Sequence, residues 1–281
     1  MTDADRPPLP IVVLISGRGS NLDAILDAID TGELPVEVRA VISNRPDARG
    51  LQRPALQGIR TIVIDHACQR DRAAFDRTLQ ATIDTLEPEL LVLAGFMRIL
   101  TPDFVEHYQG RMLNVHPSLL PAYRGPVPLF WQFRAGVKTF GITLHRMSLR
   151  LDAGNIVAQT GVAMPDGVSG RQADVLLAEA GSEMLIHTLR KSGRDRLSGS
   201  AQDEGDASYQ GFPSASDYSV SVSWSAQRLY NFICATRDRG VRYPCRIDNR
   251  IYWLLQADAW QRTGESRLVV NGNRLSIPCQ R

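Results

Sequence analysis

The sequence has little cysteine, little lysine and no long apolar run. The four cysteines lie far apart and form none of the CxxC pairs typical of zinc and redox sites, so we expect free, buried thiols and no metal site at Cys68, Cys234, Cys245 and Cys279. No stretch approaches the ~18 apolar residues of a membrane span. The polar, proline-rich start of the chain lacks the apolar segment of a secretory signal. We therefore expect a cytoplasmic protein with no membrane partner.

Charge points to no large partner. The 32 basic and 30 acidic residues give a formal net charge of +2, and the arginines are scattered while lysine is rare. This pattern argues against a nucleic-acid surface, although transfer RNA is not excluded. A chain of 281 residues, 43% of them hydrophobic, is long enough for one large core and a second, small domain.

Apolar strands alternate with helical patterns in the first part of the chain. Strands are predicted at 11–15, 36–42, 60–64 and 90–94, and the uninterrupted apolar runs at 11–15 and 90–94 suggest a sheet covered on both faces. Residues 22–29 and 72–86 have apolar side chains at helical spacing. This alternation predicts an α/β fold with a Rossmann-like, doubly wound, mostly parallel sheet. Apolar and polar residues alternate at 141–147 and, less cleanly, at 156–162, which predicts that the sheet ends in antiparallel strands.

A change in composition divides the chain. A helix is predicted over 172–189, and the following residues 191–208 are rich in Ser, Gly and Asp with almost no large apolar side chains. We therefore predict a first domain at 1–190, a linker at 191–208 and a small β-rich C-terminal domain at 209–281. In the last of these, an amphipathic helix at 225–235 precedes short strands at 245–247, 251–255 and 267–270.

Three side chains carry the groups that acyl transfer to an amine requires. The amine attacks a carbonyl carbon, so charge grows on oxygen, the attacking nitrogen loses a proton and the leaving nitrogen gains one. Asn114 offers an amide N–H to the oxyanion, and His116, two positions further along an extended segment, points to the same side. Asp152, in the loop LRLDAGN, offers a carboxylate to orient and charge the imidazole. Each pattern alone is common in turns.

Three segments resemble the signature sequences of the 10-formyltetrahydrofolate-dependent formyltransferases. They are AGFMRIL, NVHPSLLPAYRG and LDAGNIVAQ in this order, and the 38-residue step from Asn114 to Asp152 matches the family's catalytic spacing. The resemblance covers about residues 11–189. It implies the formyltransferase fold, a small-molecule amine as acceptor, 10-formyltetrahydrofolate as formyl donor, and no metal. A weaker similarity to the C-terminal domain of methionyl-tRNA formyltransferase extends from residue 209 to about residue 260.

The resemblance implies a role for each matching residue. Asn114 would hold the formyl oxygen, His116 would stabilise the oxyanion and relay a proton, and Asp152 would orient His116. The family binds folate against the segment that is here Phe96, Met97, Arg98, Ile99 and Leu100. Within it, backbone groups of Arg98 and Leu100 would hydrogen-bond the pterin.

The sequence leaves the acceptor open. SGRGSN, between the first strand and helix, matches the loop with which glycinamide ribonucleotide formyltransferases hold phosphate, which would assign Gly19, Ser20 and Asn21 to a phosphate. RGPVPLFWQFRAGVKTFGITLHRM is more similar to the transfer-RNA and sugar-nucleotide enzymes. We expect an amino-sugar nucleotide or an amino-acid derivative. The alternatives are glycinamide ribonucleotide, methionyl-tRNA, and hydrolysis of the formyl-folate to formate.

Two further hypotheses concern the site. A non-catalytic nucleotide-binding or interaction module is the alternative to an enzyme, and the joint presence of Asn114, His116 and Asp152 argues against it. His145 alternates with apolar residues in ITLHRM, which predicts a partly buried structural histidine, with a place in the cleft wall as the alternative. An oligomer is possible on this sequence.

Overall fold

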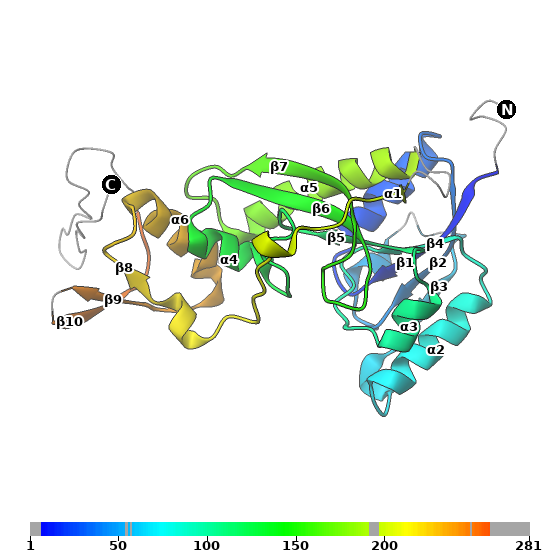
Figure 1. The fold of residues 1–281 in the computed structure, drawn as a ribbon, viewed down its shortest axis with the longest axis horizontal. Helices are drawn as coiled ribbons and strands as arrows, with labels where there is room; N and C mark the ends of the chain where they lie inside the picture. The colour runs from blue at the N-terminus through cyan, green and yellow to red at the C-terminus, as the bar shows by residue number, and fades with distance from the viewer. Residues whose placement is uncertain (1–6, 54–55, 57, 191–196, 248, 259–281) are drawn as a thin grey trace.

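A seven-stranded sheet forms the centre of the molecule (Figure 1). The structure is a computed structural model that describes residues 7–53, 56, 58–190, 197–247 and 249–258. The strands of this sheet are β1 (Leu9–Ile15), β2 (Val36–Ser43), β3 (Thr61–Val63), β4 (Leu90–Leu93), β5 (Met112–His116), β6 (Thr139–Arg146) and β7 (Ile156–Ala163). Their order in space is β3-β2-β1-β4-β5-β6-β7. Neighbours from β3 to β5 are parallel and β6 and β7 are antiparallel, so the predicted α/β class and antiparallel end are confirmed.

Helices cover both faces of this sheet, as a doubly wound fold requires (Figure 1). Those in the first part of the chain are α1 (Ser20–Asp30), α2 (Arg72–Asp84), α3 (Pro102–His107), α4 (Pro128–Ala135) and α5 (Gly170–Arg190). Alternate side chains of β1 point to opposite faces. Val13 lies in the core beneath α1 and α5, and Leu14 lies in the core beneath α2 and α3, both fully buried. Burying one such side chain contributes about 1.5–3 kcal/mol.

Two short helices were not predicted from the sequence. α3 has six residues and α4 has eight, which is too short for a clear helical period. Both begin at a proline, Pro102 and Pro128, whose fixed φ and missing N–H suit the first turn of a helix. Proline near a helix start was therefore the available signal.

The C-terminal part adds a three-stranded sheet in the order β10-β9-β8. Its elements are β8 (Val220–Ser221), α6 (Ala226–Thr236), β9 (Tyr243–Ile247) and β10 (Arg250–Leu254). Phe130 of α4 and Phe232 of α6 pack with ring centroids 5.5 Å apart, within a core that also includes Tyr243. The predicted β-rich character is confirmed, while the predicted strand at 267–270 lies outside the described residues. The small sheet and the large one thus share a hydrophobic contact through α4 and α6.

The cysteine prediction holds only in part. Cys234 and Cys245 are free and buried, as expected, but Cys68 is exposed at the end of a short 3-10 helix, His66–Cys68. Cys279 lies outside the described residues. Among the helices that the structure describes, none is long and apolar enough to cross a membrane.

Candidate active site

The fold brings three segments of the sequence to one edge of the sheet. Between β1 and β4 the strand order reverses, and ligands of such sheets bind beyond the carboxyl ends of the strands at that point. The loops after these two strands meet there: the N–H of Ser16 donates to the carbonyl of Gly95 at 3.2 Å, and the N–H of Met97 donates to the Ser16 hydroxyl at 2.7 Å. β5 lies beside β4 and carries Asn114 and His116 to the same edge.

Asn114 is paired with His145 across β5 and β6. The two residues stand opposite each other in the antiparallel register, and Nδ2 of Asn114 lies 3.1 Å from Nε2 of His145. Nδ1 of His145 lies 2.9 Å from the carbonyl oxygen of Arg146. Because a carbonyl only accepts, Nδ1 carries the proton and Nε2 accepts from the amide. This fixes the direction of the Asn114 amide and leaves its second N–H for another oxygen.

His145 is neutral in this position. It is completely buried, and this burial lowers the pKa of His145 from 6.5 to about 4. The nearby imidazole of His116 contributes a smaller part of the same shift. Asp152 opposes this shift, since its Oδ1 lies 3.7 Å from Nε2, but its effect is smaller. The expectation of a partly buried histidine is wrong in the degree of burial, since none of His145 is exposed. The alternation in ITLHRM, which turns His145 toward Asn114, was the signal for its place in the cluster.

His116 faces Asp152 within the same cluster. Nδ1 of His116 lies 3.6 Å from Oδ2 of Asp152, and its Nε2 donates to the carbonyl of Tyr123 at 3.0 Å. The rings of His116 and His145 are nearly perpendicular, with centroids 6.2 Å apart. Only 4% of His116 and 8% of Asp152 is exposed, whereas Asn114 is half-buried. The structure therefore brings Asn114, His116 and Asp152 together, with Asn114 the most accessible of the three.

Asp152 projects from a tight turn with a strained backbone. Its φ of 50° lies in the left-handed region, which for a residue other than glycine costs on the order of 1–2 kcal/mol. A Cβ on Gly154 would lie 1.8 Å from the carbonyl oxygen of Arg146, so the turn requires glycine there. The carboxylate is held by the N–H of Gly125, which donates to Oδ2 at 2.9 Å. Contacts around this turn therefore decide where the carboxylate points.

The segment after β4 combines buried and exposed apolar side chains. Phe96 and Leu100 are each 7% exposed, whereas Met97 is 72% and Ile99 is 62% exposed. The backbone N–H groups of Arg98 and Leu100 have no hydrogen-bond partner among the described residues. An apolar surface next to unpaired donors suits a flat ring that hydrogen-bonds through its edge.

The loop SGRGSN opens α1 in the manner of an anion site. Gly19 has a φ of 79° and no side chain to cap the helix. A Cβ at Gly19 would lie 2.9 Å from the Cα of Gly50, so the close approach of the two backbones requires glycine. The N–H groups of Ser20 and Asn21 stand at the positive end of the helix dipole. The side chain of Asn21 accepts from the Ser182 hydroxyl at 2.9 Å, which ties it to α5.

Comparison with known protein families matches residues 9–189 to formyl transferases. The chain belongs to the formyl transferase family. Phosphoribosylglycinamide formyltransferase of Escherichia coli (strain K12) is 46% identical over 179 residues, which cover 64% of this chain and 84% of that protein. The trifunctional purine biosynthetic protein adenosine-3 of Bos taurus is 40% identical over 157 residues, which cover 56% of this chain but only 16% of that protein.

Solved structures of phosphoribosylglycinamide formyltransferases are similar to this chain. Phosphoribosylglycinamide formyltransferase from Coxiella burnetii matches with a TM-score of 0.61 at 44% identity, covering 65% of this chain and 86% of that one. Glycinamide ribonucleotide transformylase 1 from Symbiobacterium toebii matches with a TM-score of 0.62 at 34% identity, covering 65% of this chain and 86% of that one. The predicted family, enzyme class and folate-dependent formyl transfer are confirmed.

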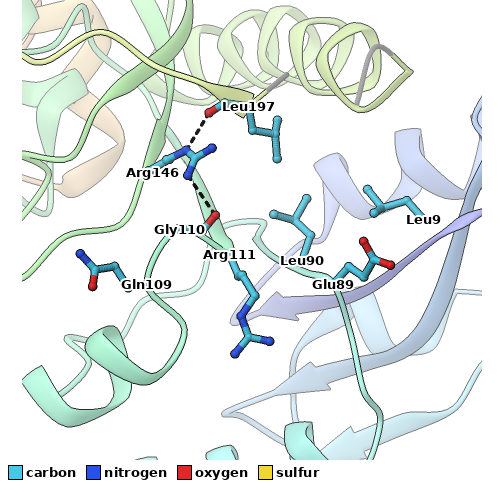
Figure 2. Close-up of a pocket in the computed structure, with 8 residues that line it drawn as sticks. All are labelled: Leu9, Glu89, Leu90, Gln109, Gly110, Arg111, Arg146 and Leu197. Atoms are coloured by element: carbon cyan, nitrogen blue, oxygen red, sulfur yellow. Dashed lines mark hydrogen bonds between the residues drawn. The ribbon is translucent and has the colours of Figure 1, made fainter. Parts of the chain in front are cut away.

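A separate cavity lies at the opposite edge of the sheet of this formyltransferase (Figure 2). Its volume is about 440 Å³, and Leu9 and Leu90, the first residues of β1 and β4, line it. The Arg146 guanidinium donates there to the carbonyls of Leu197 at 2.6 Å and Gly110 at 3.1 Å. The cavity lies at the amino ends of these strands, whereas Asn114, His116 and Asp152 lie at the opposite edge of the sheet. It is therefore not part of the site. Among the described residues no group of three or more His, Cys, Asp or Glu side chains is placed to hold a metal ion.

Proposed function

We propose that this formyltransferase moves the formyl group of 10-formyltetrahydrofolate to the amino group of glycinamide ribonucleotide. The observation that carries the proposal is the 46% identity with a phosphoribosylglycinamide formyltransferase over most of that protein's length. A second such enzyme, from Haemophilus influenzae, is 40% identical over 152 residues. The acceptor expected from the sequence, an amino-sugar nucleotide or amino-acid derivative, has less support, because no relative described above carries such a name.

The phosphate of the acceptor would bind at the start of α1. The backbone N–H groups of Ser20 and Asn21, next to the left-handed turn at Gly19, would offer an anion hydrogen bonds at the positive end of the helix dipole. The acceptor would then lie beyond β1, with its amine directed along the edge of the sheet toward β5.

The formyl donor would bind beyond β4. The exposed Met97 and Ile99 support the flat face of the pterin, and the unpaired N–H groups of Arg98 and Leu100 meet its polar edge. Buried Phe96 anchors the segment from below. The donor and acceptor sites then lie on either side of the switch point, with Asn114 next to both.

Asn114 and His116 would act on the carbonyl. The second N–H of the Asn114 amide binds the formyl oxygen and stabilises the charge that develops when the amine attacks, and such a donor is worth about 3–4 kcal/mol of barrier. His116 stabilises the same oxygen, gives a proton to the leaving nitrogen as its bond to the formyl carbon breaks, and takes one from the attacking nitrogen, so the side chain ends the turnover unchanged. The carboxylate of Asp152, 3.6 Å from Nδ1, orients His116.

Two alternatives differ in what accepts the formyl group. In hydrolysis, water replaces the amine and the product is formate, with the same cluster of side chains at work. In the methionyl-tRNA reaction, the C-terminal residues would contact RNA. The phosphate-type loop at Gly19 favours a small acceptor that carries its own phosphate over both.

A panel of acceptors tests the proposed function. The purified chain is mixed with 10-formyltetrahydrofolate and, separately, glycinamide ribonucleotide, an amino-sugar nucleotide, methionyl-tRNA or no amine, while the folate absorbance is followed. We expect kcat/KM for glycinamide ribonucleotide to exceed the others by at least about 100-fold, since an analogue leaves the polar groups of the site unpaired. A higher value for another acceptor, or equal turnover without amine, would contradict the proposal.

A further inference from the structure

A segment beyond the family match lies against the loops of the site. The match ends at residue 189, yet residues 200–210 return to the first domain (Figure 1, yellow). Ser200 forms an antiparallel bridge with Ile156, with N–O distances of 2.9 and 2.8 Å, and Tyr209 forms a parallel bridge with Arg124. These contacts lie on the strand after Asp152 and on the loop after His116, the two places from which the proposed catalytic side chains come.

Gln202 connects these two places through one side chain. Its Nε2 donates to the carbonyl oxygens of Asp152 at 2.8 Å and Gly154 at 2.7 Å. Its Oε1 accepts from Nε of Arg124 at 3.0 Å and from Nη2 at 2.7 Å. Both donors and both lone pairs of the amide are therefore used. The two carbonyls belong to the left-handed turn of Asp152, so Gln202 holds that strained turn from outside.

Arg124 gives this arrangement a rigid base. Its side chain is fully buried, and Glu204 compensates its charge through contacts at 3.0 and 3.2 Å. The guanidinium also keeps the pKa of the Glu204 carboxyl below its ordinary value, mainly through its hydrogen bonds to that carboxyl. Tyr209 adds its hydroxyl as a further acceptor and its ring as a stacking partner. Gln202 is thus attached to a group that is itself fixed.

Ser208 fixes the loop on the opposite side of the cluster. Its hydroxyl accepts from the N–H of Tyr123 at 2.8 Å, and its carbonyl accepts from the N–H of Arg124 at 2.9 Å. The same loop presents the Tyr123 carbonyl to His116 and the Gly125 N–H to Asp152. Residues 200–210 therefore brace both loops that set the distance between imidazole and carboxylate.

We propose that Gln202 is a positioning residue for formyl transfer, which holds the turn of Asp152 so that its carboxylate faces His116. The proposal rests on the roles assigned above to Asp152 and His116. A positioning role predicts a loss of turnover without a loss of substrate binding, because the Gln202 amide is fully occupied by Arg124, Asp152 and Gly154. It also predicts that the loss depends on Asp152 being present.

Two substitutions separate hydrogen bonding from packing. Gln202→Ala removes the bridge, and Gln202→Glu keeps the size and still accepts from Arg124 but cannot donate to the two carbonyls. For both we expect kcat to fall about 10- to 100-fold, the scale of a misplacement of about 1 Å, with KM for either substrate within about twofold of wild type. Asp206→Ala, an exposed change in the same segment, is the matched control and should leave kcat unchanged.

A double-mutant cycle with Asp152→Asn decides the assignment. If Gln202 acts through Asp152, adding Gln202→Ala to Asp152→Asn produces no further loss of kcat. An equal fold-loss in both backgrounds, or wild-type kcat in Gln202→Ala, would overturn the proposal. Should Gln202→Ala not fold, as judged by circular dichroism, Gln202→Glu takes its place in the cycle with the same expected outcomes. Wild-type kcat in Asp152→Asn alone would instead remove the proposed mechanism, so the two failures are distinguishable.

Discussion

The amide of Asn114 donates to Nε2 of His145 across two antiparallel strands, at a distance of 3.1 Å. The other ring nitrogen of that imidazole, Nδ1, donates to the carbonyl of Arg146. The strand pairing thereby sets the orientation of the side chain that would bind the formyl oxygen. This is a strong constraint for a site in which the amide must present an N–H and not its own oxygen.

Replacing His145 should therefore impair turnover through Asn114. We expect His145→Ala to lower kcat about 10- to 100-fold, because the amide can rotate and present its oxygen. His145→Gln can still supply an acceptor for Nδ2 of Asn114 and should recover part of the loss. The measurement is steady-state kcat with both substrates saturating. Identical losses in the Ala and Gln variants would show that His145 matters only for packing.

The neutral state of His145 makes folding stability depend on pH. The folded pKa of about 4 lies below the ordinary value of 6.5, so the unfolded chain binds the proton more tightly between these values. The contribution of His145 to the free energy of unfolding is fully present above pH 6.5 and is lost as the pH falls toward 4. Urea unfolding of wild type and His145→Gln across this range measures it. We expect the wild-type value to fall more steeply, and parallel curves would contradict the assignment.

Gly19 should not tolerate a side chain. At a φ of 79° and with its prospective Cβ 2.9 Å from Gly50, Gly19→Ala requires both a strained backbone and a displaced neighbour. We expect the free energy of unfolding to fall by about 1–3 kcal/mol. Gly17→Ala is the matched control for stability, since a Cβ there meets no atom within 4 Å. Equal stability of the two variants in urea unfolding would refute the steric argument.

A negative charge at the start of α1 should oppose the acceptor's phosphate. Ser20→Asp places a carboxylate where the N–H groups face the anion, so we expect KM for glycinamide ribonucleotide to rise about 10- to 100-fold by charge repulsion. KM for 10-formyltetrahydrofolate should change by less than about twofold, because the donor site lies beyond β4. An acidic residue in the first turn interacts favourably with the helix dipole and stabilises the helix, so the variant should remain folded. An unchanged KM for the acceptor would remove the phosphate site from this loop.

The sequence predicted the parts of the fold that depend on local pattern. The runs at 11–15 and 90–94 became strands because continuous apolar residues are stable only where both faces are covered. β8 has two residues, and α3 has six, which leaves too few positions for a period to be visible. The order of the strands, and hence the meeting of the loops after β1 and β4, is a property of packing that no single segment encodes.

The site was predictable to the extent that its residues occur in recognisable segments. Asn114 and His116 stand on one extended segment, and the spacing to Asp152 came from the family resemblance. Gln202 had no such signal, because it lies in a stretch whose polar composition is typical of linkers and its partners are about 50 to 80 positions away in the chain. His145 became significant only through its register opposite Asn114.

Transfer of a labelled formyl group tests the central claim most directly. With 10-formyltetrahydrofolate labelled in the formyl carbon and glycinamide ribonucleotide as acceptor, a single turnover by the wild-type chain should place the label in the new N-formyl group of the product. Asn114→Ala should slow that step about 100- to 1000-fold. Label released as formate by the wild type, or transfer by Asn114→Ala at the wild-type rate, would contradict the account.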